Sequence, residues 1–343
     1  MRRTLPSIKT GRAPPSPDSQ LSMMLPGYHI LTGGSMDKTK ALIVGATGWL
    51  GHQIAAALLD GGKAEVRALV RPDTSNADKV KRIEGLRSRG MTIVHGDLND
   101  HASMAKACAG IDVVISAVQG GPDVIVEGQG RLLAAAEAAG VKRMIPSDFS
   151  ADIARLDYED NYNLGLRKKF GESIASSSVA STSVLCGGFL DVVLSPRFST
   201  VDWEKGALRF WGDGNQPVDY TAISDVALYT AAVATDRDMA GKPLYVAGNS
   251  LTALELQRAL ESATGRSLQA LSLGTLEQLR SLIEEKKRTA KNPWEWISLQ
   301  YAWVSASGKG KLPYLDNSRY PEINPISVAE FARRTIKVRQ AQA

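Results

Sequence analysis

The chain has 343 residues, of which 43% are hydrophobic and 22% charged, so it can bury a sizeable core. These proportions exclude a disordered protein and a small disulfide-stapled scaffold. The net charge is +5, but residues 1–36 hold four basic residues and one acid, so the rest of the chain is almost balanced. We therefore expect no nucleic-acid partner.

Other broad classes are also excluded by the sequence. No window is an unbroken run of about 20 apolar residues, so we expect no membrane span. Cys108 and Cys186 lie far apart without a CxxC motif, and the four histidines form no HExxH motif, so we expect neither a metal site nor a disulfide framework. A soluble, cytoplasmic protein is the resulting expectation.

The first 36 residues form a separate segment in the sequence. Residues 1–36 contain five of the fifteen prolines and show neither helical nor strand periodicity, which predicts a disordered tail. The segment can be interpreted as an organelle-targeting peptide or as an extension upstream of Met36. Pro14, Pro15 and Pro17 would break the amphipathic helix of a targeting peptide, which favours the second interpretation.

From residue 37 to about 195, short β-branched runs alternate with helical stretches. This alternation predicts a parallel sheet covered by helices on both faces, which is the doubly wound Rossmann architecture. The expected strands are Ala41–Val44, Glu65–Val70, Thr92–His95, Asp112–Ser116 and Lys142–Ile145, and the expected helices include Leu50–Leu59 and Val124–Ala139.

From residue 196 to 343 the alternation is less regular, which predicts a smaller C-terminal substrate lobe. We expect a strand near Pro243–Val246 to return to the sheet. Leu254–Ser262 and Leu276–Lys286 carry apolar residues three and four positions apart and are expected to be helices.

A glycine-rich loop follows the first predicted strand and precedes the first predicted helix. Its glycines, Gly45, Gly48 and Gly51, have the spacing GxxGxxG. Glycine permits a tight turn, a close approach of the backbone to a pyrophosphate, and close packing of helix on strand. The loop therefore predicts a dinucleotide site, with the phosphates at the helix N-terminus.

The end of the second predicted strand indicates which dinucleotide is bound. A site for NAD usually has an acidic residue there, whereas this strand is followed by Arg71, with Lys79 in the next helix. Both side chains could hold a 2′-phosphate, so NADP(H) is favoured over NAD. Asp97 and the segment from Ser116 to Val118 follow the third and fourth strands, at the edge where such sheets bind ligands.

Five segments together resemble the NmrA-like, isoflavone-reductase-like branch of the atypical short-chain dehydrogenases/reductases. They are residues 45–51, 66–71, 96–97, 112–116 and 141–149, the last of which includes the sequence Pro-Ser-Asp-Phe. The resemblance implies a Rossmann domain, a smaller substrate lobe and NADPH-dependent reduction of aromatic molecules such as isoflavones, phenylcoumarans or lignans. It assigns Gly45, Thr47, Gly48, Trp49, Leu50 and Gly51 to the pyrophosphate, Arg71 and Lys79 to the 2′-phosphate, Ser116, Ala117 and Val118 to the cofactor's middle, and Pro146 and Ser147 to the nicotinamide.

The candidate catalytic residues follow from the same resemblance. Where the reductases have a lysine, this chain has Arg167, followed by Lys168. Because arginine stays protonated, it can stabilise an oxyanion but is a poor proton donor. Either Lys168 has taken over the role, or Arg167 acts electrostatically and water or a hydroxyl, for which Tyr162 is the candidate, supplies the proton.

Two functions stay open at this point. None of the nine tyrosines has a lysine four residues later, so the conventional short-chain dehydrogenase pair is absent. The first function is an NADPH-dependent reductase, and the second is a non-catalytic NADP(H)-binding redox sensor, as some NmrA-like proteins are. The sequence does not identify the substrate or the oligomeric state, for which a homodimer is one option.

Overall fold

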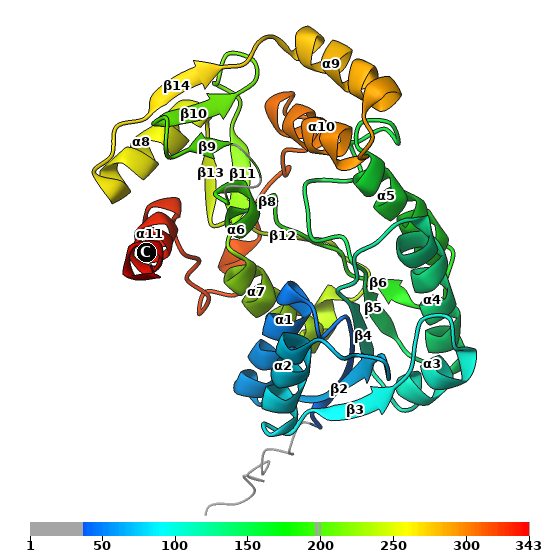
Figure 1. Cartoon of the computed structure of the whole chain (residues 1–343). Helices are drawn as coiled ribbons and strands as arrows, with labels where there is room; N and C mark the ends of the chain where they lie inside the picture. Colours follow the sequence, from blue (N-terminus) through cyan, green and yellow to red (C-terminus); the bar gives the residue numbers. More distant parts are fainter. Residues whose placement is uncertain (1–36, 196–197, 199, 343) are drawn as a thin grey trace, which may run out of the picture. The chain divides into compact units, whose positions relative to one another are not determined.

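Six parallel strands form the central sheet of the chain. The structure is a computed structural model that describes residues 37–195, 198 and 200–342, and residues 38–343 form one compact unit (Figure 1). The predicted disordered tail, residues 1–36, lies outside the described residues. The strand order is β3-β2-β1-β4-β5-β6, and every neighbouring pair is parallel. The strands are β1 (Thr39–Val44), β2 (Ala64–Val70), β3 (Thr92–His95), β4 (Val113–Ser116), β5 (Arg143–Ile145) and β6 (Ala180–Ser181).

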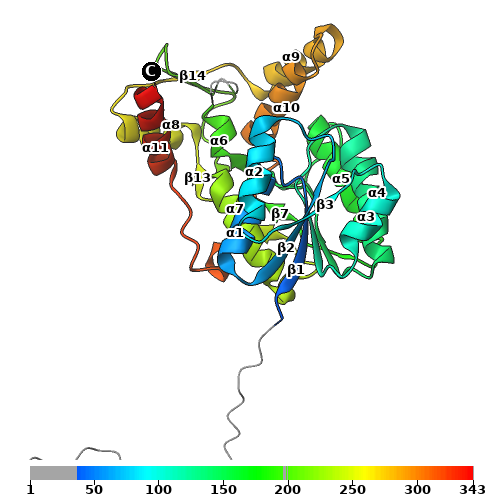
Figure 2. The same cartoon turned by 60° about the horizontal axis from the view of Figure 1, so that its bottom comes forward.

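Helices cover both faces of this sheet, as Figures 1 and 2 show. The alternation of side chains along β1 explains why: Ala41 and Ile43 belong to one hydrophobic core, and Leu42 and Val44 to the other. One core contains residues of α1 (Trp49–Gly61), α2 (Ala77–Arg87) and α7 (Ile223–Thr235). The other contains residues of α3 (His101–Cys108), α4 (Gln129–Ala138) and α5 (Tyr162–Ala175). The predicted doubly wound parallel sheet is therefore confirmed.

The helix expected over 124–139 is present, but its first residues are not α-helical. It begins as the π-helical segment η1 (Asp123–Gly128) and continues as α4. Gln129 is fully buried at the junction and donates from its side-chain amide to the carbonyl of Ile125 at 2.9 Å. Segments of this kind widen a helix locally and often lie at functional sites.

The C-terminal lobe is named here for β9, β10, β14 and α8 to α11. Residues of β9, β10, α8 and α11 share one apolar core, whereas α9 and α10 pack in another with Leu156 and Leu164. In this lobe β10 (Ala207–Phe210) pairs with β9 (Val201–Asp202) and β14 (Gln269–Ser272). The expected helices at 254–262 and 276–286 are confirmed as α8 (Ala253–Thr264) and α9 (Leu276–Thr289). The remaining helices of the lobe are α10 (Trp294–Ala306) and α11 (Val328–Gln342). A second small sheet has the order β13-β11-β8, with β13 (Asn249–Leu251), β11 (Val218–Thr221) and β8 (Gly188–Phe189).

Two elements beyond residue 195 lie with the sheet and not with the C-terminal lobe. Helix α7 packs on α1, and β12 (Leu244–Tyr245) pairs in parallel with β7 (Val184–Leu185), which follows β6 in the chain. The strand expected near 243–246 therefore exists, but its partner is β7 and not a strand of the six-stranded sheet. The domain boundary at residue 195 stays a prediction. Helix α7 and strand β12 lie beyond this boundary in sequence but pack with the N-terminal part of the chain. Every helix in the described part of the chain is too short or too polar to span a bilayer.

A buried arginine on the sheet donates hydrogen bonds to the C-terminal end of α7, and its replacement should destabilise the fold. Arg143 on β5 is 6% exposed and donates to the backbone carbonyls of Ala234 and Asp236. Replacing it by methionine leaves two carbonyls without their charged donor, so the free energy of unfolding should fall by about 2–3 kcal/mol. Urea denaturation measures this, and Lys142→Met, at an exposed neighbouring position, is the control. Equal stability of the two variants would contradict the prediction.

Candidate functional site

The glycine-rich loop is shaped by two close backbone contacts. Gly45 has φ of 101°, and a Cβ there would lie 2.4 Å from the carbonyl oxygen of Ala117. A Cβ on Gly51 would lie 2.3 Å from the carbonyl oxygen of Gly45. The loop closes through a hydrogen bond from the Gly48 N–H to the Gly45 carbonyl at 2.9 Å. Larger residues at Gly45 or Gly51 would push the loop away from β4 or from α1.

The N-terminus of α1 is suited to bind an anion. Gly48 is its N-cap and offers no side chain to accept from the first N–H groups, and the first turn contains no acidic residue. These N–H groups and the helix dipole therefore favour a negatively charged ligand.

A cavity of about 780 Å³ extends from this helix N-terminus along the carboxyl edge of the sheet. Its lining includes twelve of the residues expected at a site: Gly45, Thr47, Gly48, Trp49, Leu50, Arg71, Lys79, Asp97, Ala117, Val118, Ser147 and Arg167. We call this cavity the main pocket.

One end of the main pocket is basic. Arg71 directly follows β2 and is exposed, and Lys79 lies in the first turn of α2, where the side chain of Asn76 caps its N–H. Thr74 lines the same end. Two cationic residues therefore line this end of the pocket, which favours a negatively charged ligand there.

Three residues expected at the site lie behind the lining. Gly51 and Pro146 are buried, and Ser116 is completely buried with no hydrogen-bond partner for its hydroxyl within the described residues. Their expected roles in cofactor binding stay predictions, and Gly51 contributes through the shape of the loop.

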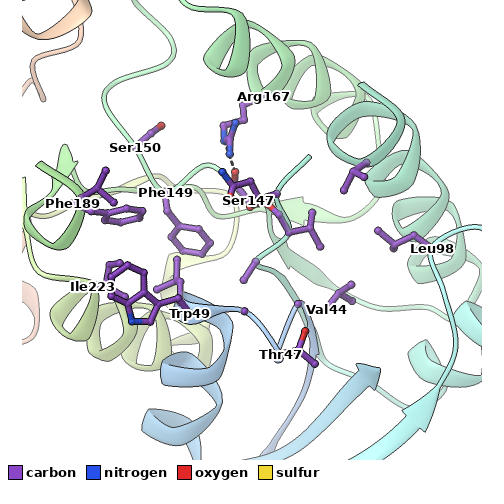
Figure 3. Close-up of a pocket in the computed structure, with 18 of the residues that line it drawn as sticks. Val44, Thr47, Trp49, Leu98, Ser147, Phe149, Ser150, Arg167, Phe189 and Ile223 are labelled. Carbon is purple, nitrogen blue, oxygen red and sulfur yellow. Dashed lines mark hydrogen bonds between the residues drawn. The ribbon is translucent and has the colours of Figure 1, made fainter. Parts of the chain in front are cut away.

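Arg167 reaches the main pocket from α5 and is held in place by two backbone carbonyls. Its Nε donates to the Ser147 carbonyl at 2.8 Å (Figure 3). Its Nη1 donates to the Asn163 carbonyl at 2.9 Å. The Nη2 group has no hydrogen-bond partner among the described residues. The guanidinium is thus a fixed positive charge with donors left for a ligand.

Lys168 and Tyr162 do not line the main pocket. The Lys168 ammonium donates to the Leu156 carbonyl at 2.6 Å and lies 5.7 Å from the centre of the Tyr158 ring. Tyr162 begins α5, is 40% exposed and packs edge-on against Trp296 with ring centroids 5.7 Å apart. Consecutive positions on a helix differ by about 100° in direction, so Arg167 faces the pocket and Lys168 faces away. Of the three catalytic candidates, Arg167 lines the main pocket, and its catalytic role stays a prediction.

An apolar wall of the pocket was not expected from the sequence. Trp49, Phe149, Phe189 and Ile223 lie together on one side of the main pocket (Figure 3). Trp49 is 55% exposed despite its size. These residues come from four separate segments, so only the tertiary structure brings them together. The wall is suited to contact a flat apolar ligand.

Ser147 is fixed by Gln129, which the sequence did not single out, and by Val118 and Arg167, which it did. Gln129 accepts from the Ser147 N–H at 3.1 Å, and the Ser147 hydroxyl donates to the Val118 carbonyl at 2.7 Å. With Arg167 bound to its carbonyl, Ser147 is held from three sides. No local pattern in the sequence singles out Gln129, because its burial depends on how η1 and α4 pack.

Asp148 is a buried acid behind the pocket. Burial raises its pKa to about 6, although a hydrogen bond from Ser183 and the charge of Arg167 act in the opposite direction. Its Oδ2 accepts from the Ser183 hydroxyl at 2.8 Å, while Oδ1 has no partner within the described residues.

This buried acid should give the fold a measurable pH dependence. In the folded protein the Asp148 carboxyl binds its proton more tightly than in the unfolded chain, where its pKa is the ordinary 3.8. The bound proton therefore stabilises the fold fully below pH 3.8, and this stabilisation is lost as the pH rises through about 6. From pH 4 to pH 7, the wild type should lose about 2 kcal/mol of unfolding free energy relative to Asp148→Asn. Urea denaturation at both pH values measures this difference, and a pH-independent difference would contradict the prediction.

The strand order and the glycine-rich loop with its anion-binding helix terminus define a protein of the Rossmann type. More specifically, the chain belongs to the NmrA-like family, whose sequence model matches residues 37–292. The resemblance predicted from the sequence is thereby confirmed.

Relatives and solved structures agree with this assignment. Isoflavone reductase homolog P3 of Arabidopsis thaliana is 31% identical over 257 residues, which cover 72% of this chain and 82% of that protein. A structure of AtPrR2 with NADP+ and (+)pinoresinol superposes with a TM-score of 0.75 at 26% identity, covering 86% of this chain and 98% of the other. The binary complex of leucoanthocyanidin reductase with NADPH, from Vitis vinifera, gives a TM-score of 0.73 at 26% identity, covering 85% and 98%.

Proposed function

We propose that this protein is an NADPH-dependent reductase of a small aromatic substrate. The observation that carries the proposal is one continuous pocket with an anion-binding loop and two cations at one end, and Arg167 beside an aromatic wall at the other. Two of the solved structures to which the chain is similar hold NADP+ or NADPH, and one of these also holds the aromatic molecule pinoresinol.

The residues of the pocket fit this cofactor. The first N–H groups of α1 would bind the pyrophosphate, because Gly48 leaves them uncapped and Gly45 and Gly51 allow the close approach. Arg71 and Lys79 would bind the 2′-phosphate. The lining residues Ala117 and Val118 would border the middle of the cofactor and Ser147 the nicotinamide, with Asp97 nearer the adenine.

Arg167 would stabilise the charge that develops on the substrate. NADPH, when bound, supplies the hydride. The Arg167 guanidinium is fixed by Ser147 and Asn163, so it would stabilise negative charge on a substrate oxygen without reorganising. Because an arginine keeps its proton, we assign proton delivery to water. Trp49, Phe149 and Phe189 would hold the aromatic part of the substrate against the pocket.

Cofactor preference and turnover test the proposal. The protein should bind NADPH more tightly than NADH in calorimetric titrations, and it should oxidise NADPH when a panel including (+)-pinoresinol and isoflavones is added. Arg71→Ala should weaken NADPH binding by about 10- to 30-fold and leave NADH binding unchanged, because it removes one charge-assisted contact to the 2′-phosphate. Arg87→Ala, at an exposed position of α2 outside the pocket lining, is the matched control.

The same experiments separate the reductase from the sensor. Binding of NADPH without oxidation by any substrate of the panel would support a redox sensor. Failure to bind either cofactor, or a clear preference for NADH, would overturn the proposal.

A further inference from the structure

Gln129 lies where the π-helical segment η1 becomes the α-helix α4. Its backbone N–H donates to the carbonyls of Val124 and Val126, and not to that of Ile125, which is the acceptor in a regular α-helix. The side chain of Gln129 supplies this donor, because its amide N–H bonds to the Ile125 carbonyl at 2.9 Å. Gln129 is also completely buried, so the widened turn holds its side chain in one position.

The other end of the Gln129 amide reaches the segment after β5. Its oxygen accepts from the Ser147 N–H at 3.1 Å. The Ser147 carbonyl in turn accepts from the Nε of Arg167 at 2.8 Å, the hydrogen bond drawn in Figure 3. Two hydrogen bonds through one residue therefore connect the η1–α4 junction to the guanidinium in the main pocket.

Gln129 itself does not line the main pocket, whereas the groups that it holds do. Ser147 and Arg167 belong to the lining. Asp123 and Val124 of η1 belong to it as well. A ligand in the pocket therefore has no direct contact with the Gln129 amide, and any effect of this residue on a reaction must pass through the groups that it holds.

The other groups that anchor Ser147 and Arg167 are backbone carbonyls. The Ser147 hydroxyl donates to the Val118 carbonyl at 2.7 Å, and the Nη1 of Arg167 donates to the Asn163 carbonyl at 2.9 Å. A side-chain substitution does not remove a backbone carbonyl. Gln129 is thus the position at which a substitution can release Ser147 while the pocket keeps its lining side chains.

We propose that Gln129 is a positioning residue of the reductase, which fixes the Arg167 guanidinium through Ser147. The inference rests on the proposed function, in which Arg167 stabilises negative charge on the substrate. A displacement of a functional group by about 1 Å can cost about 100-fold in rate. Loss of the Gln129 amide should therefore slow the reaction while cofactor affinity is kept, because the N-terminus of α1 and Arg71 do not depend on it.

Hydrogen exchange of the Arg167 Nε–H tests the proposal without cofactor or substrate. Heteronuclear NMR on the full chain measures this proton, which is assigned by its absence in Arg167→Lys. Gln129→Met has a similar size but removes both hydrogen bonds of the amide, so the Arg167 proton should exchange at least about 10-fold faster. Arg319, whose Nε donates to Asp236 at 2.8 Å, is the internal reference and should not change.

The reaction itself gives a second readout. In single-turnover oxidation of NADPH, Gln129→Met should lower the rate by about 10- to 100-fold and change the NADPH dissociation constant by less than about 3-fold. In combination with Arg167→Ala it should cause no further loss, because a residue that acts through Arg167 has no effect once that side chain is absent. The same loss with and without the Arg167 side chain would show a merely structural role and would overturn the inference.

Two further variants keep the test decisive. Gln129→Asn has an amide that is one methylene shorter and cannot span from Ile125 to Ser147, so it decides the matter if Gln129→Met does not fold. Gln257→Met is the matched control, because it removes a side-chain amide of α8 that donates to the Leu268 carbonyl. This control should keep both the Arg167 exchange rate and the turnover rate of the wild type.

The outcome can be separated from that of the proposed function. Faster Arg167 exchange in the Gln129 variants supports the anchoring of Arg167 by Gln129 even if no substrate of the panel is reduced, and the missing turnover would then count against the proposed function alone. Unchanged Arg167 exchange in a folded Gln129 variant would overturn the inference even if the protein is an active reductase.

Discussion

Gly51→Ala should lower the affinity for NADPH by about 100-fold. The new Cβ would lie 2.3 Å from the Gly45 carbonyl oxygen, which belongs to the backbone and cannot rotate away. Either α1 or the loop must shift, and the N–H groups that would bind the pyrophosphate then lose their alignment. The expected 100-fold loss of affinity corresponds to about 3 kcal/mol of binding free energy, the size of effect that steric overpacking produces. Calorimetric titration of the folded variant measures the dissociation constant.

The matched control lies at the other end of the same helix. Gly61 ends α1, and a Cβ there would meet no heavy atom within 4 Å. Gly61→Ala should therefore bind NADPH as the wild type does. If Gly51→Ala also bound NADPH normally, the loop would not be the pyrophosphate site.

Arg167→Ala should reduce kcat by about 100- to 1,000-fold and change the affinity for NADPH by less than about 3-fold. Two backbone carbonyls hold the Arg167 guanidinium in place, and its remaining donors face the pocket. Its removal therefore takes away the positive charge that would stabilise the transition state. Arg167→Lys keeps a charge but loses the two-carbonyl anchor, so its kcat should be intermediate. Single-turnover NADPH oxidation with the best substrate of the panel measures the effect.

Lys168→Ala is the control for the neighbouring cation. The Lys168 ammonium is occupied by the Leu156 carbonyl and lies outside the pocket lining, so kcat should be unchanged. A large loss in Lys168→Ala with a normal Arg167→Ala would reverse the roles assigned here.

The sheet and the glycine loop could be predicted because both are local patterns. The strand-loop-helix segment from β1 through Gly51 to α1 contains its own geometric requirements, and the apolar strands define a buried parallel sheet. The packing of α7 could not be predicted in this way. Its residues follow the lobe strands in sequence, but its apolar face packs in the core of the sheet.

The candidate site was predictable at the basic end of the main pocket and less so around Arg167. Arg71 follows directly from the end of β2. By contrast, the sequence could not decide between Arg167 and Lys168, because the direction of each depends on how α5 packs. Phe189 and Trp294 come from segments far apart in the chain, and no local pattern shows that both line one pocket.

The three hydrogen bonds around Ser147 have a consequence for ligand entry. Its N–H, hydroxyl and carbonyl are all bound to protein groups, on η1–α4, the loop after β4 and α5. Because Ser147 is already held in one conformation, a ligand that binds beside it loses little affinity to ordering of this part of the pocket. Substitutions in the C-terminal lobe should then alter substrate selectivity while the end of the pocket at Ser147 keeps its geometry.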